Sequence, residues 1–125
     1  MRKTALLMAI VGLLVASAAG ASAAVFGADI DRAVVSGGQV VSISGTIACT
    51  QGDEYLLRVN VFDRDGNTAI GRASGTCTGN PQEYVTSVVE SDSGFACGEL
   101  LGGHGQARAG GDQKSFSDRT QAVCP

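Results

Sequence analysis

Residues 39–50, QVVSISGTIACT, are the stretch from which the fold can be inferred. From Val41 onward, every second position belongs to one apolar or small series, made of Val41, Ile43, Gly45, Ile47 and Cys49. Serine and threonine occupy most of the positions between them. Alternation over this length indicates a β-strand with one buried face. Because the buried face ends in a cysteine, we expect this strand to carry one half of a disulfide.

Residues 1–23 have the three-part pattern of a cleavable secretory signal peptide. Arg2 and Lys3 are followed by an apolar run, residues 5–15, and then by small residues up to position 23. The alternative, a membrane-spanning helix, needs about 20 consecutive apolar residues, and this run is shorter. We expect cleavage before Ala24, with cleavage after Ala21 or after Ala24 as alternatives. The product would be one secreted, extracellular domain, residues 24–125, with no stable membrane insertion.

The charge of the expected product argues against two classes of partner. Without Arg2 and Lys3 there are seven basic and twelve acidic residues, a net charge of about −5. The basic residues do not cluster along the sequence. Nucleic acids and anionic lipids are bound by lysine and arginine side chains that neutralise phosphates. We therefore expect neither nucleic acid nor a lipid surface as the partner.

All four cysteines lie in residues 24–125, at Cys49, Cys77, Cys97 and Cys124. An even number of cysteines in a short exported chain indicates disulfides. A structural metal site usually brings its ligands in close pairs such as C-x2-C, and no two cysteines here are close in sequence. The sequence therefore predicts two disulfides and no metal.

Turn signals divide the rest of the chain into short apolar segments. The glycine-rich residues 36–38 and the Asp-Gly turn in residues 63–67 are typical hairpin connections. We predict about seven strands, at residues 29–35, 39–50, 54–63, 68–78, 82–90, 105–109 and 115–124. This pattern favours an all-β fold, an immunoglobulin-like antiparallel β-sandwich with two disulfides. A small closed barrel is the alternative.

Four cysteines allow three pairings. Cys49 ends the inward face of residues 39–50, and Cys77 shares a face with the small residues of 68–78, which would let a second sheet approach closely. We therefore predict a Cys49–Cys77 bridge. A Cys97–Cys124 bridge would then tether the C-terminus over the glycine-rich segment 98–111.

Several of these positions together resemble a known group of proteins. They are V-x-I-x-G-x-I-x-C-T at 41–50, L-x-V-x-V at 57–61, G-T-C-T-G at 75–79, Phe95, and Q-A-R-A at 106–109. The chain resembles a functionally uncharacterised group of small secreted actinobacterial-type immunoglobulin-like β-sandwich proteins. The resemblance implies the fold, the compartment and the first disulfide, and it brings no active site.

The residues that most often carry chemistry do not form a recognisable catalytic set. The single histidine, His104, lies in segment 98–111, and no serine has a G-x-S-x-G context. We expect His104 to be a solvent-facing loop residue. The pairs Glu90/Asp92 and Asp53/Glu54 are expected to be solvated turn acids, since glycosidase-type catalysis needs two carboxylates across a substrate.

Residues 63–67 resemble the beginning of a calcium loop. Such a loop needs glycine at position 6 and glutamate at position 12, whereas counting from Asp63 places Gly66 at position 4 and Ser74 at position 12. A hairpin turn explains the cluster better. We expect no metal and no cofactor.

The sequence favours a non-catalytic structural or protein-interaction role, and we expect no enzymatic activity. It does not identify the partner, which could be a protein or a small molecule. The alternative is a secreted ligand carrier or hydrolase inhibitor that acts through the glycine-rich loop 98–111.

Overall fold

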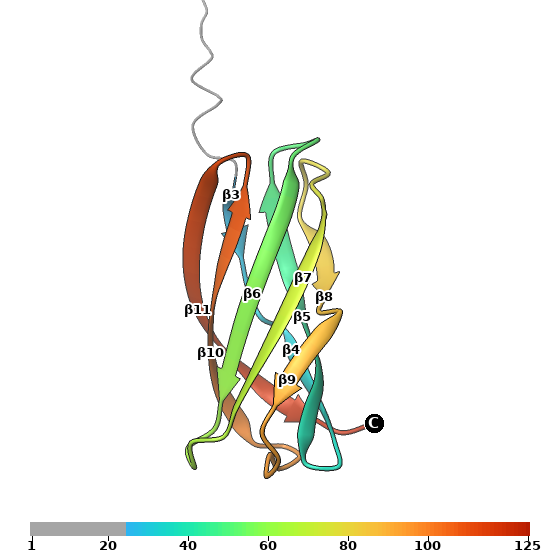
Figure 1. The fold of residues 1–125 in the computed structure, drawn as a ribbon, viewed down its shortest axis with the longest axis vertical. Helices are drawn as coiled ribbons and strands as arrows, with labels where there is room; N and C mark the ends of the chain where they lie inside the picture. The colour runs from blue at the N-terminus through green and yellow to red at the C-terminus, as the bar shows by residue number, and fades with distance from the viewer. Residues whose placement is uncertain (1–24) are drawn as a thin grey trace, which may run out of the picture.

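The computed structural model describes residues 25–125, which form an all-β fold of nine strands in one mixed sheet (Figure 1). The expected signal peptide, residues 1–23, lies outside the described residues. Within the described part there is no helix of the length and apolar character that a membrane span requires. The strands are β3 (Val25–Ala28), β4 (Arg32–Ser36), β5 (Gln39–Cys49), β6 (Glu54–Phe62), β7 (Thr68–Thr76), β8 (Gln82–Val85), β9 (Val88–Ser91), β10 (Leu100–Ala109) and β11 (Asp112–Val123).

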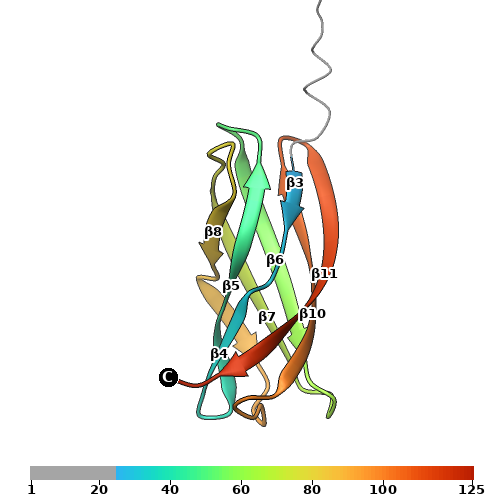
Figure 2. The same cartoon turned by 180° about the vertical axis from the view of Figure 1, so that it is seen from behind.

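The sheet folds over itself into two facing layers that share β11. One layer has the order β9-β7-β6-β10-β11, and the other contains β8, β5, β3 and β4. Figures 1 and 2 show these layers from opposite sides of an elongated molecule. Most of β11 pairs antiparallel with β10, whereas Ala122 and Val123 pair in parallel with β4. This parallel pair departs from the antiparallel arrangement expected from the sequence, and it arises because the end of β11 crosses to the other layer.

The core lies between the two layers as a single cluster of buried side chains. The predicted strands at residues 54–63 and 68–78 are present as β6 and β7, and burial alternates along them, since Val59 and Val61 of β6 and Ala69 of β7 are almost completely buried. On the other layer Ile43 and Ile47 of β5 are also fully buried. Removal of this apolar surface from water is the main force that holds the layers together.

The expected inward orientation of Val41 is wrong, because a β-bulge interrupts the alternation of β5. Ala33 of β4 pairs with Ile43, but the next inward residue, Val35, pairs with Val40. The extra residue shifts the pattern by one. Val40 is therefore buried, and Val41 is 51% exposed.

The predicted strand at residues 29–35 begins later than expected. Residues 29–31 form the link between β3 and β4, and both of these strands pair with β5. The backbone of this link also pairs with β5, because the amides of Asp29 and Asp31 donate to the carbonyls of Thr46 and Ser44 over 2.9 and 2.8 Å.

The predicted strand at residues 82–90 is divided between the two layers. β8 pairs with β5 and β9 pairs with β7. The change of layer occurs at two neighbouring residues: the amide of Thr86 donates to the Ile43 carbonyl, and the amide of Ser87 donates to the Arg72 carbonyl, each over 2.9 Å. The crossing breaks one predicted strand into two.

The glycine-rich segment 98–111 is not a loop, which corrects the expectation from its composition. Its central part is β10, which is longer than the predicted strand 105–109 and pairs with β6 on one edge and with β11 on the other. A Cβ at Gly102 would lie 2.6 Å from the Phe62 ring, and a Cβ at Gly105 would lie 2.5 Å from the Phe116 ring. These glycines are needed because aromatic side chains of neighbouring strands lie over the β10 backbone.

Both predicted disulfides are present. Cys49 and Cys77, with their Cα atoms 5.4 Å apart, join β5 of one layer to the end of β7 in the other, and both are buried. Cys97 and Cys124, with Cα atoms 5.6 Å apart, tie the C-terminal end to the segment before β10, and both are exposed. The first bridge therefore lies in the core and the second on the surface.

Candidate functional site

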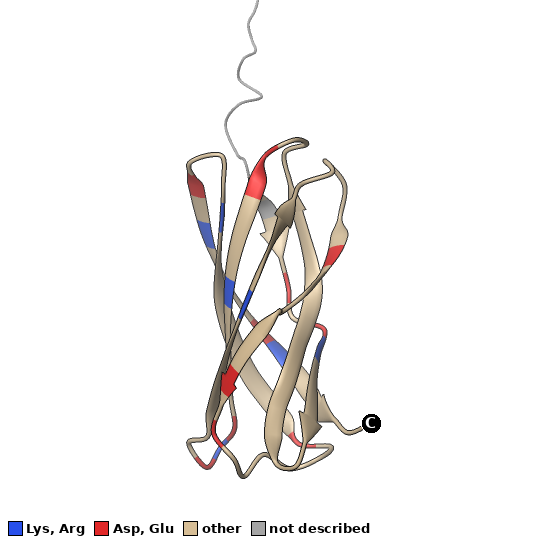
Figure 3. Cartoon of the chain, turned by 45° about the vertical axis from the view of Figure 1, so that its right-hand side comes forward, with Lys and Arg blue, Asp and Glu red and all other residues tan. Residues whose placement is uncertain are grey.

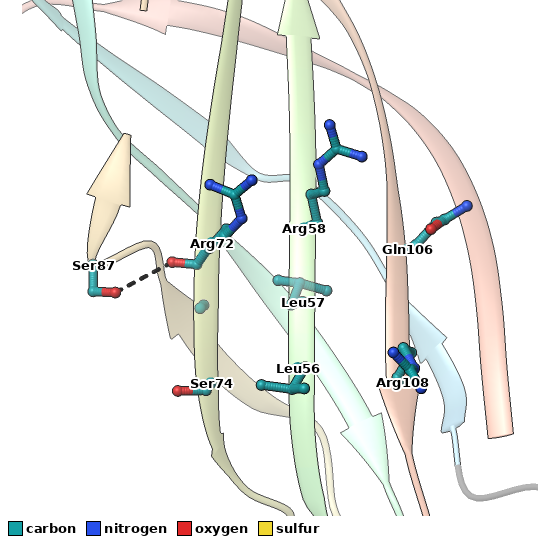
Figure 4. A pocket seen from close by; sticks show the side chains of 9 residues that line it. Leu56, Leu57, Arg58, Arg72, Ser74, Ser87, Gln106 and Arg108 are labelled. Atoms are coloured by element: carbon teal, nitrogen blue, oxygen red, sulfur yellow. Dashed lines mark hydrogen bonds between the residues drawn. The ribbon is translucent and has the colours of Figure 1, made fainter. Parts of the chain in front are cut away.

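The outer face of β6, β7 and β10 carries a shallow groove of about 380 Å³ (Figure 4). Successive side chains of a strand point to opposite faces of a sheet, so the neighbours of the core residues point to solvent here. Leu57 and Ala73 form the floor. The other lining residues are Leu56, Arg58, Arg72, Ser74, Ser87, Gln106 and Arg108.

The register of the strands brings three arginines of this groove together. Arg58 on β6 lies directly opposite Arg72 on β7, and Arg108 on β10 lies directly opposite Leu56 of β6. Cβ atoms at directly opposite positions are about 4.5–5.5 Å apart, and two residues along a strand span about 6.6 Å. In Figure 4 the side chains of Arg58 and Arg72 extend side by side in the same direction. We call Leu56 and these three arginines the arginine face.

Within residues 25–125 the three guanidinium groups have no hydrogen-bond or ion-pair partner. The polar contact drawn in Figure 4 goes to the backbone, since the Ser87 hydroxyl donates to the Arg72 carbonyl over 3.4 Å. Like charges directly opposite each other in a sheet are destabilising. The arrangement of Arg58 and Arg72 therefore costs stability and leaves two positive charges for an external anion.

The rest of the described chain is strongly acidic, so this face differs in sign from its surroundings. Acidic side chains gather at the link between β3 and β4, with Asp29 and Asp31, and in the β6–β7 turn, with Asp63 and Asp65. In Figure 3 basic segments lie near the middle of β6 and β7, whereas much of the red lies toward the ends of the fold. A protein with an acidic pI, about 4.9, thus carries a positive patch on this face.

The absence of a basic cluster in the sequence is misleading, because folding gathers residues that are far apart in the chain. One signal of the patch was present in the sequence. Arg58 and Arg72 are equally distant from Asp65 at the centre of the 63–67 turn, so a symmetric hairpin places them opposite each other. Arg108 could not be found this way, because its place depends on the pairing of β10 with β6.

His104 is exposed, as expected, but it lies on strand β10 and not in a loop. Its ring centroid is 6.0 Å from that of Phe62, with the ring planes inclined by 52°. Of the predicted turn acids, Asp92 accepts hydrogen bonds from the amide and the hydroxyl of Thr68 over 2.9 and 3.4 Å. Glu54 and Glu90 are solvent-exposed as expected, but they lie on strands β6 and β9 and not in turns, which corrects that part of the prediction.

Asp63 organises the β6–β7 turn, as the hairpin interpretation of residues 63–67 predicted. Its Oδ1 accepts the amides of Asp65 and Asn67 over 3.0 and 2.8 Å, and its Oδ2 accepts the Asn67 side-chain amide over 2.9 Å. Burial acts to raise the pKa of Asp63, but these hydrogen bonds and one from the Gly66 amide outweigh it, and the pKa is lowered. Carboxylate oxygens of Asp63, Asp65 and Glu99 lie within 4.8 Å of one another. Both Asp63 oxygens are already used by the turn.

Asp63 should make the fold sensitive to acid. A carboxylate whose pKa is lowered by folding contributes stability that is complete above its ordinary pKa of 3.8 and is lost as pH falls through the lowered value. We expect the variant Asp63→Asn to lose less unfolding free energy than the wild type between about pH 6 and pH 2.5. Urea unfolding at both pH values measures this. Asp65→Asn is the control, and an equal effect of both variants would contradict the assignment.

No protein-family model matches this chain, and the search of curated proteins finds no match.

Proposed function

We propose that this chain is a secreted, non-catalytic binding domain that recognises its partner through the arginine face. The observation that carries the proposal is the placement of Arg58 directly opposite Arg72, with Arg108 on the neighbouring strand and no ion-pair partner for any of the three among the described residues. A fold gains nothing in stability from such an arrangement. A negatively charged partner would neutralise the two opposed arginines, so recognition of such a partner accounts for their arrangement.

Export and the immunoglobulin-like topology are parts of the same proposal. Disulfides persist in oxidising compartments, which supports the signal-peptide interpretation of residues 1–23. The two-layer arrangement supports an immunoglobulin-like sandwich of the uncharacterised actinobacterial type. N-terminal sequencing of the secreted protein should give Ala24 as the first residue. A membrane-bound product that retains Met1 would contradict export.

A binding role fits the chemistry of the face better than catalysis. Guanidinium groups stay protonated at any physiological pH, so they bind and orient anions but do not exchange protons as general acids or bases. The groove is shallow and open, whereas catalysis benefits from a site that excludes water. These features support a non-catalytic interaction surface.

The stability cost of the face is itself testable. We expect Arg72→Gln to raise the free energy of unfolding by about 0.2–1 kcal/mol, because it removes the repulsion across the β6–β7 pair. The gain should shrink at high salt, which screens exposed charges. Arg32→Gln on β4 is the matched control with the same change in net charge. Urea unfolding at low and high salt measures both, and a destabilised Arg72→Gln variant would show that Arg72 is structural.

The function is tested by capture from the medium and the cell envelope of the producing cells. The full chain is expressed and secreted as wild type, as R58Q/R72Q/R108Q and as Arg32→Gln. We expect a partner that the wild type and the Arg32→Gln variant retain and the triple variant loses. Capture that is equal for all three proteins, or absent for all three, would overturn the proposal.

A further inference from the structure

We infer that the arginine face binds an acidic, extended peptide segment of a partner protein, with carboxylates two residues apart and an apolar side chain beside them. This inference rests on the proposed binding function and specifies its ligand. It is drawn from the charge, the spacing and the apolar component of the groove.

Carboxylates are the simplest match for the charged part of the face. An arginine guanidinium is a planar fork of donors that can bind both oxygens of a carboxylate at once. Arg58 and Arg72 are directly opposite each other, so one carboxylate between them can accept from both. A second carboxylate can then be bound by Arg108.

Along the strand direction, the backbone positions of the arginines lie in two rows separated by the repeat of an extended chain, and the sideways step of about 4.8 Å from β6 to β10 is bridged by the long side chains. Arg58 pairs with Gln106 on β10, and Arg108 lies two residues further along the same strand. Two residues of a strand span about 6.6 Å. A peptide that lies along β6 in extended form presents every second side chain to the face, and so repeats at the same spacing.

The groove also contains exposed apolar surface. Leu56 is 60% exposed and shares its row with Arg108 and Ser74. An apolar side chain two residues beyond the second carboxylate of the ligand can lean back over Leu56 from the next row, which would remove apolar surface of both molecules from water. A small inorganic anion would leave this surface uncovered. The face therefore fits a peptide that carries both kinds of side chain.

Long polyanions fit the face less well. Single-stranded nucleic acids stack their bases on aromatic side chains, and the lining of this groove contains none. The positive patch is also short, because exposed carboxylates of Glu54 on β6 and Glu90 on β9 lie on the strands that form or flank it. A nucleic acid or a sulfated polysaccharide that extends beyond the three arginines would meet these negative charges.

The test uses three capped hexapeptides and the full chain purified after secretion. The first, ETETLT, has the inferred spacing; QTQTLT lacks the charges; EETTLT has the same charge with adjacent carboxylates. Binding is followed by NMR shifts of backbone amides at low salt. We expect ETETLT to shift amides of β6, β7 and β10 and to bind about tenfold more tightly than QTQTLT. EETTLT should be weaker than ETETLT.

Variants assign the binding to the face. R58Q and R72Q should each weaken ETETLT binding by about five- to tenfold, and added salt should weaken it further. Arg32→Gln should leave it unchanged. Equal binding of ETETLT and EETTLT, or an equal loss in Arg32→Gln, would mean non-specific attraction and would overturn the inference.

Two further outcomes separate the inference from the proposed function. A heparin fragment or an oligothymidylate that binds the wild type more tightly than ETETLT, and loses binding in the R58Q/R72Q/R108Q variant, would overturn the peptide as ligand and leave the binding function standing. A captured partner that depends on the face but has no acidic extended segment would do the same. If the three arginines affect neither peptide binding nor the capture of any protein, both the inferred ligand and the proposed binding function are overturned.

Discussion

Replacing Cys49 and Cys77 together with alanine should lower the free energy of unfolding by about 4–5 kcal/mol. The two cysteines are 28 residues apart, and closing a loop of that size in the unfolded chain accounts for about 3–4 kcal/mol. Both residues are also buried in the core between the layers, so their removal leaves space that neighbouring side chains fill incompletely. Urea unfolding of the secreted protein, followed by circular dichroism, measures the loss.

The second disulfide provides a matched control for the first. Cys97 and Cys124 are 27 residues apart, so the chain-entropy contribution is nearly the same, but both are exposed on the surface. Their replacement with alanine should cost about 3 kcal/mol. The difference between the two double variants then reports the effect of burial. Equal losses would show that the core position of Cys49 and Cys77 contributes nothing beyond loop closure.

Gly45→Ala should cost about 3–5 kcal/mol, the second largest effect that we expect. A Cβ at this position of β5 would overlap the carbonyl oxygen of Asp29 and would lie 2.8 Å from the Tyr84 hydroxyl. That hydroxyl donates to the Asp29 carbonyl over 2.6 Å. The added methyl group therefore causes overpacking and separates a hydrogen-bonded pair in which Tyr84 is buried. Thermal and urea unfolding measure the loss.

The environment of Gly45 leaves little room for adjustment. Burial, with a smaller contribution from nearby Asp29, raises the pKa of Tyr84, so its hydroxyl stays a hydrogen-bond donor. Thr46 donates its amide to Asp29 Oδ1 over 2.8 Å. Asp29 is thus held from two sides, and β5 cannot move away from it without loss of these bonds.

Gly27→Ala on β3 is the control for this prediction. No atom lies within 4 Å of a Cβ built on Gly27, so alanine should be tolerated or should stabilise by up to about 1 kcal/mol through the unfolded state. Tyr84→Phe separates the two causes, because it removes the hydroxyl without adding a methyl group. If Gly45→Ala destabilises the fold no more than Gly27→Ala does, β5 does not approach Asp29 as closely as described here.

Local pattern was enough to predict much of this fold from the amino-acid sequence. The alternation in β6 and β7, their Asp-Gly turn and the inward position of Cys49 and Cys77 all depend on neighbours within one strand or one hairpin. In a strand without a bulge, successive side chains point to opposite faces of the sheet, so the local pattern decides which residues face inward. For that reason the pairing of the cysteines and the opposition of Arg58 to Arg72 can be predicted from the sequence.

Contacts between distant segments decided the rest. The bulge that turns Val41 outward depends on how β4 pairs with β5, and the division of residues 82–90 depends on both layers being in place. Segment 98–111 has the composition of a loop, yet it is a strand because β6 and β11 satisfy its backbone and Phe62 and Phe116 cover its glycines. Arg108 joins the arginine face through the same pairing. Pairing between strands so far apart in sequence leaves no local periodicity, so only the folded chain reveals it.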